Sequence, residues 1–266
     1  MTARPQVNTT MTRWTTFPCV GEYAFDAARL ERNWARLHAG DAEPLPEDPA
    51  VRDAWALFHR GEFERAAHAG LQAGGSGITV ANKATAIYAN FLERKEKHKL
   101  DLLLEVARRA HEQALLEPTN PNAWFWQGYA LGRYSQGISV AKALAQGLGS
   151  RVKEALERTL ELQPRHAEAH IALGAFHAEV IDKVGSLLGR TQGASKDAGL
   201  AMYKQALKLN PASAIARVEY ANGLVMLEGD KKMKEAEKLY AEAAECEPKD
   251  AMERLDVEMA KAELEE

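Results

Sequence analysis

The sequence has few of the features that mark several common classes of protein. Its 34 basic residues do not outnumber its 38 acidic residues, so there is no positive surplus for a nucleic-acid backbone or an anionic membrane. The two cysteines, Cys19 and Cys246, are far apart and neither belongs to a CxxC motif, so neither can form a zinc or dithiol motif within one segment. We expect reduced thiols and no nucleic-acid partner.

Long apolar runs are also missing. No stretch approaches the roughly 20 apolar residues that a membrane-spanning helix needs. The residues before Cys19 contain no continuous apolar segment, which argues against a signal peptide and a lipid anchor. These absences predict a cytoplasmic protein with no membrane span.

Alanine is abundant in this sequence. The 266 residues include 47 alanines but only 12 valines and 6 isoleucines. Alanine is the strongest helix former, whereas β-branched residues favour strands. With 46% hydrophobic and 27% charged residues, the chain is typical of a well-packed soluble protein. The composition therefore predicts an all-α fold.

Four prolines divide much of the chain into helices. Each follows an apolar, helix-like run, and the four are Pro118, Pro164, Pro211 and Pro248. A proline cannot continue a helix and disfavours helical geometry in the residue before it. Each proline therefore predicts the end of one helix, and an alanine-rich segment after it predicts the start of another.

The segments that follow the first three prolines align with one another. Residues 123–131, 169–177 and 216–224 share the pattern of an alanine, a large residue and, further on, a small residue. The small residues are Gly128, Gly174 and Ala221. We expect two helices to approach closely at each of them.

This pattern resembles the tetratricopeptide repeat, a helix–turn–helix unit that stacks into a right-handed solenoid of antiparallel helix pairs. An earlier unit is visible over residues 54–67, and residues 79–95 and 99–116 predict another helix pair. We expect the repeat domain to span residues 49–251. Residues 1–48 are predicted to form an N-terminal segment that docks on the solenoid through its aromatic residues, and residues 252–266 an acidic C-terminal capping helix.

Two middle repeats are lengthened. Gly128 and Gly174 are 46 residues apart, and the added residues fall at the same point of each repeat, at 135–150 and 182–195. Matching insertions lie on one face of a solenoid, and the alanine-rich residues 138–146 favour a prolonged helix. With these long repeats, residues 120–229 resemble the regulator-of-microtubule-dynamics proteins and the T-component proteins of TRAP-type solute transport. That resemblance implies a ligand-binding surface, and a transport accessory role is one alternative.

The first helix of each repeat is expected to line a concave groove. The predicted groove residues are Phe125, Tyr129, Arg133, Ile171, Glu179, Val218, Asn222, Val225 and Met226. Most of them are apolar, which favours a non-catalytic scaffold that holds a protein or peptide segment, or alternatively an apolar small molecule. The competing interpretation is that these side chains simply pack as core.

A metal-dependent or enzymatic protein is the other alternative. His166, His170 and His177 share one helical neighbourhood, where a metal would need a further acidic ligand. However, Glu168 is two residues after the first histidine, not one as in the zinc-protease helix. The glycine-rich residues 73–78 lack the Gly-Lys-Ser/Thr ending of a phosphate-binding loop. We therefore predict no metal, no cofactor and no catalytic residue.

Overall fold

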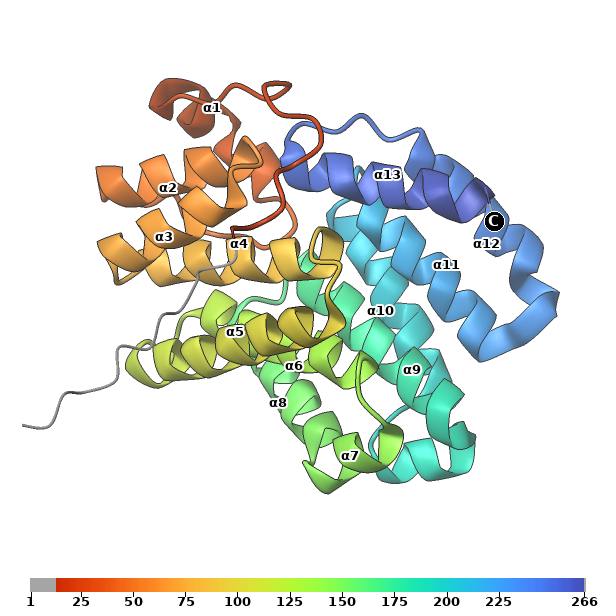
Figure 1. Ribbon diagram of the computed structural model, residues 1–266. Helices are drawn as coiled ribbons and strands as arrows, with labels where there is room; N and C mark the ends of the chain where they lie inside the picture. Colours follow the sequence, from red (N-terminus) through yellow and green to blue (C-terminus); the bar gives the residue numbers. More distant parts are fainter. Residues whose placement is uncertain (1–12, 266) are drawn as a thin grey trace, which may run out of the picture.

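The computed structural model describes residues 13–265, and every regular element in that range is a helix (Figure 1). Thirteen α-helices and one 3₁₀ turn follow one another: α1 (Ala27–Leu37), α2 (Pro49–His59), α3 (Phe63–Ala73), α4 (Gly77–Phe91), α5 (Glu96–Leu116), α6 (Pro121–Gln136), α7 (Val140–Ala145), α8 (Leu148–Leu162), α9 (Ala167–Thr191), α10 (Lys196–Leu209), α11 (Ala214–Glu228), η1 (Gly229–Lys232), α12 (Met233–Ala244) and α13 (Ala251–Glu265). The all-α prediction is confirmed.

Prolines and caps set the helix boundaries. Helices α5, α8, α10 and α12 each end within four residues of one of the four prolines. The next helix begins with a residue that satisfies the free amide groups of its first turn. The Asn120 side chain caps α6, the His166 ring caps α9, and the Ser213 hydroxyl caps α11. The local sequence thus encodes most of the stops and starts.

Successive helices pack as antiparallel pairs. The pairs are α2 with α3, α4 with α5, α6 with α8, α9 with α10, and α11 with α12. Two of the predicted close contacts lie inside these pairs. A side-chain carbon at Gly128 would lie 3.0 Å from Leu156, and one at Gly174 would lie 2.9 Å from the Tyr203 ring. The stacked pairs form a tetratricopeptide-like solenoid.

The two insertions adopt different structures. The first does not prolong α6, because that helix ends at Gln136 and Gly137, and a separate six-residue helix, α7, follows. Gly147, with φ of +60°, reverses the chain before α8. In the second insertion, the backbone of α9 leaves the helical conformation at Gly185, where φ is +79°, and a second helical segment then runs to Thr191. A positive φ favours glycine at both turns.

The two ends of the described chain meet. Trp14 stacks on Tyr88 with ring centroids 4.2 Å apart, so the N-terminal segment packs on α4. At the other end, α13 packs on α11 and α12 and also reaches α2 (Figure 1). Arg36 of α1 forms a bidentate ion pair with Glu253 of α13. Helix α13 therefore connects the last repeat to the first.

Candidate functional site

A cavity of about 170 Å³ lies between α6 and α9. The walls are formed mainly by α6, α8 and α9. One end is bordered by α7 and by Lys183 and Val184 of the second insertion, and α13 contributes Met252 and Asp256. The two insertions and the last helix therefore all contribute to the wall of the cavity.

Most of the cavity wall is apolar. Phe125 and Tyr129 are one helical turn apart on α6, and their ring centroids are separated by 5.8 Å. Ile171 and Phe176 face them from α9, and Val152 does so from α8. The four-residue spacing of Phe125 and Tyr129 on α6, and of Ile171 and Ala175 on α9, places each pair on one face of its helix. Such a wall suits an apolar group of a ligand.

The structure brings together five of the nine predicted groove residues. The residues that line the cavity are Phe125, Tyr129, Arg133, Ile171 and Glu179. Phe125 is fully buried and belongs to the main hydrophobic core as well. Phe125 therefore lines the cavity, as the groove prediction expects, and also packs in the core, as the competing interpretation expects.

The four predicted residues of α11 lie elsewhere. Val218 packs in a cluster between α11, α12 and α13, and Asn222 accepts a hydrogen bond from the Tyr240 hydroxyl. Val225 is half-buried and Met226 is exposed, and neither lines the cavity. Helix α11 instead contributes Ile215 and Glu219. Val218 is one position before Glu219, so it points about 100° away around the helix.

Charged side chains also border the cavity. Arg133 donates to Glu219 at 2.5 Å and joins α6 to α11. Burial alone would lower the pKa of Arg133, but the adjacent Glu219 carboxylate raises it overall. Glu179 accepts from Gln136 at 2.5 Å and lies 3.5 Å from Lys183. Burial raises the pKa of Glu179.

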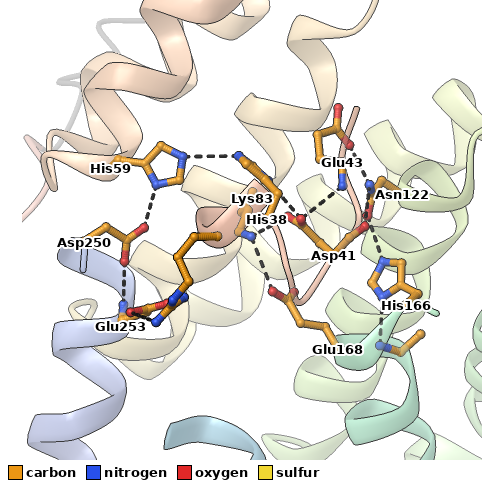
Figure 2. Close-up of polar contacts among 12 residues, drawn as sticks. His38, Asp41, Glu43, His59, Lys83, Asn122, His166, Glu168, Asp250 and Glu253 are labelled. Atoms are coloured by element: carbon orange, nitrogen blue, oxygen red, sulfur yellow. Dashed lines mark hydrogen bonds and ion pairs between the residues drawn. The ribbon is translucent and has the colours of Figure 1, made fainter. Parts of the chain in front are cut away.

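A buried polar network lies beside the cavity (Figure 2). Its centre is Lys83 of α4, whose ammonium group donates to Asp41 at 2.6 Å and lies 3.5 Å from Glu168 of α9. Burial disfavours the charged lysine, but the Asp41 and Glu168 carboxylates outweigh that effect and raise its pKa. Burial raises the pKa of Glu168 to about 7. Glu168 also lines the cavity, so the network and the cavity share a wall.

Two histidines, His38 and His59, extend this network to Asp250, just before α13 (Figure 2). His38 Nδ1 lies 2.9 Å from Asp41, the two Nε2 atoms of His38 and His59 are 3.3 Å apart, and His59 Nδ1 lies 2.6 Å from Asp250. Burial lowers the pKa of His38 to about 4. The network therefore connects three parts of the chain, which are the loop after α1, helix α2, and Asp250 just before α13.

A third histidine is part of the same network. His166 Nε2 donates to Asn122 at 2.9 Å, and its Nδ1 accepts from the amide of Ala169, which caps the start of α9. Asn122 in turn donates to Glu43 at 2.5 Å. Burial lowers the pKa of His166 to about 3, so the ring is neutral. His166 therefore serves as a helix cap within the protein core.

The three histidines of the metal alternative are occupied by separate partners. His170 Nε2 lies 3.1 Å from the Pro164 carbonyl, and His177 Nδ1 accepts from the amide of Ser195 at 3.3 Å. Within residues 13–265, no group of three histidine, cysteine or acidic side chains is arranged to hold a metal ion. Over the same range, no helix combines the length and apolar character needed to cross a bilayer.

Sequence reasoning missed Lys83, Asp41 and Asp256. Lys83 has no charged neighbour within α4 that would indicate its role. Its partner Asp41 comes from a loop 42 positions earlier, and Asp256 lies in a helix that the sequence indicates only as a terminal cap. The only local signal is a lysine within an otherwise uncharged helix, which indicates a buried and paired charge.

Comparisons with known proteins agree with this architecture. The family model described as "Regulator of microtubule dynamics protein 1-3" matches residues 76–266. Among solved structures, a tetratricopeptide-repeat protein of Thermus thermophilus superimposes with a TM-score of 0.57 and 19% identity, over 80% of this chain and 97% of that one. The match confirms the repeat fold. A comparison with curated protein sequences found no match.

Proposed function

The chain belongs to the regulator of microtubule dynamics protein 1-3 family, and we propose that it is a non-catalytic binding scaffold. The observation that carries this proposal is the cavity between α6 and α9, whose aromatic and aliphatic walls suit an apolar ligand group. The tetratricopeptide-like fold supports the same role, since solenoids of this kind present extended concave binding surfaces.

The occupant is an apolar small molecule or the hydrophobic part of a protein segment. Two features support a ligand space in place of a fully packed core. Ala172 and Ala175 line the cavity with small side chains that leave room beside the Phe125 and Tyr129 rings. Arg133 and Glu179 border the apolar wall and offer polar contacts to the end of a bound group. Burial of apolar area contributes about 25 cal/mol per Å², so Tyr129, which is only partly buried, contributes more to such binding than the fully buried Phe125.

The test fills the cavity without removing its core aromatics. Ala175→Trp places a large ring in the space, and Ala241→Trp, on the exposed face of α12, is the matched control. Both variants are first shown to be folded by circular dichroism. Nile red, a neutral apolar dye, is then titrated and its fluorescence followed. We expect Ala175→Trp to lower dye affinity at least tenfold, with the control unchanged. Equal binding by both variants would contradict the proposal.

A further inference from the structure

One carboxyl group beside the cavity has no partner. Asp256 of α13 is only 3% exposed, and its Oδ1 atom makes no hydrogen bond within residues 13–265. Burying a carboxyl group in an apolar environment without a hydrogen bond is unfavourable. Burial, with the nearby carboxylates Asp250, Glu168 and Glu253, raises the pKa of Asp256 well above its usual value. An unsatisfied group of this kind calls for an explanation.

The neighbouring carboxyl groups are all paired. Asp250 lies 2.6 Å from His59, and Glu168 lies 3.5 Å from Lys83. Glu253 forms its bidentate pair with Arg36. Each basic side chain of this cluster is therefore already engaged with one of its carboxylates. Among the described residues, Asp256 is the member of the cluster left without a cation.

Asp256 borders two neighbouring cavities. It lines the apolar cavity, and it also lines a second, smaller cavity of about 30 Å³. Glu168, Ile171, Ile215 and Met252 border both cavities as well, so the two spaces adjoin there. The smaller one exceeds the roughly 10 to 15 Å³ that one water molecule requires. It has room for a small polar head group at the end of an apolar chain.

We propose that the Asp256 carboxylate binds the ammonium group of a small amphipathic amine whose apolar chain lies in the cavity. This inference rests on the proposed function of the cavity. The ammonium group occupies the smaller space and donates to Asp256 and to Glu168, which replaces the missing hydrogen bond. Glu168, Asp250 and Glu253 also border the smaller space, but each already has a basic partner, so Asp256 is the carboxylate there whose charge a bound cation complements. A carboxylate or phosphate head group would be repelled there.

A peptide is a poorer occupant than an alkyl amine. Each residue of an extended peptide brings an amide and a carbonyl that need hydrogen bonds when they are buried. The middle of the wall, formed by Phe125, Ile171, Phe176 and Val180, offers no polar side chain to meet them. An alkyl chain makes no such demand, and its single polar group reaches Asp256.

Binding is expected to release a proton. The raised pKa of Asp256 favours the protonated carboxyl when no cation is bound, whereas a bound ammonium group stabilises the carboxylate. The carboxyl proton leaves to solvent and the amine keeps its own proton, so up to one proton from Asp256 is released per ligand. The titratable groups that border the two cavities with Asp256 are Lys83 of α4, Tyr129 and Arg133 of α6, Glu168, Glu179 and Lys183 of α9, Glu219 of α11, and Asp250 and Glu253.

The experiment compares three probes with the same chain, octylamine, octan-1-ol and octanoate, by isothermal titration calorimetry on the full chain. We expect octylamine to bind at least tenfold more tightly than octan-1-ol, and octanoate to bind most weakly. Repeating the octylamine titration in two buffers of different ionisation enthalpy should reveal the released proton. The affinity for octylamine should rise between pH 6 and pH 8.

Two variants assign the preference to Asp256. Asp256→Asn keeps the shape and removes the charge, and Glu258→Gln changes an exposed carboxyl two residues along the same helix. The first should bind octylamine and octan-1-ol within twofold of each other, and the second should match the parent. Equal binding of both probes by the parent protein overturns the amine site and leaves the apolar cavity intact. No binding of either probe overturns both proposals.

Discussion

The ammonium group of Lys83 lies 2.6 Å from Asp41 Oδ2, and both side chains are buried. This contact joins α4 to the loop after α1, across 42 positions of sequence. The aromatic rings of Trp55, Phe58 and Trp126 surround the same ammonium group at 5.5 to 5.9 Å. The contacts of Lys83 therefore connect the N-terminal segment, the first two repeats and α9.

Replacing this lysine should destabilise the protein strongly. Lys83→Met retains the apolar stem but leaves Asp41 charged and buried without its cation. Loss of one partner of a buried ion pair costs about 3 to 5 kcal/mol, and urea unfolding measures it. Lys97→Met, at an exposed position of α5, is the control and should change stability little. Adding Asp41→Asn to Lys83→Met should recover part of the loss. Equal midpoints for both single variants would show that the pair is not a stabilising contact.

The contact glycines provide a second test. A side-chain carbon at Gly174 would lie 2.9 Å from the ring of Tyr203, which Gly223 also confines from the other side. The ring cannot move away freely, so Gly174→Ala should cost roughly 1 to 3 kcal/mol. At Gly132 the nearest atom is 3.9 Å away, and Gly132→Ala should stabilise α6 by about 0.5 to 1 kcal/mol. Thermal melts that shift equally for both variants would contradict this difference.

The helix pairs were predictable because their signals are local. A proline stop, a capping side chain and a small residue at a helix contact each act within a few residues of sequence, as at Pro164, Ser213 and Gly174. The helix pair of α4 and α5 follows from the same local periodicity. The structure of the first insertion was less predictable, because Gly137 ends α6 while the residues after it also favour a helix.

The cavity was predictable only in part. Helical phase placed Phe125 and Ile171 on its wall, because repeats with similar packing present the same face. The same reasoning gave the wrong residues on α11. Helix α13 packs against α11, and the residues of α11 that line the cavity are Ile215 and Glu219. The position of α13 depends on contacts with α1 and α2, more than 190 positions away. Asp256 could not be recognised before those long-range contacts were known.

The histidine cluster makes a prediction about metal. His170→Gln should leave both the metal content and Nile red binding of the protein unchanged, because its ring lies against the Pro164 carbonyl and the Met202 sulfur outside the cavity. Elemental analysis of the purified parent protein and the variant measures this. Stoichiometric zinc in the parent that disappears in the variant would instead support the metal-dependent alternative.

The buried Glu43 should make stability depend on pH. Burial raises its pKa from 4.5 to about 8, and the Asp41 charge adds to this effect. Between these values the folded state binds more protons at this site than the unfolded state, so stability falls as pH rises. The buried histidines act in the opposite direction, because burial lowers the pKa of His38 to about 4. Their contribution is confined mainly to pH below 6.5, which leaves pH 6.5 to 8 as the window for Glu43 and Glu168.

Glu43→Gln isolates the contribution of Glu43. The amide replaces the protonated carboxyl, and its oxygen can still accept from Asn122, which donates to Glu43 at 2.5 Å. One bound proton corresponds to a slope of at most about 1.4 kcal/mol per pH unit, so the variant should lose a measurable part of the decline between pH 6.5 and pH 8. Urea unfolding at four pH values in that window measures the slope. Glu47→Gln, at an exposed position in the loop before α2, is the control and should keep the parent slope. If Glu43→Gln and the parent show the same slope, then Glu43 is already ionised in the folded protein at pH 6.5.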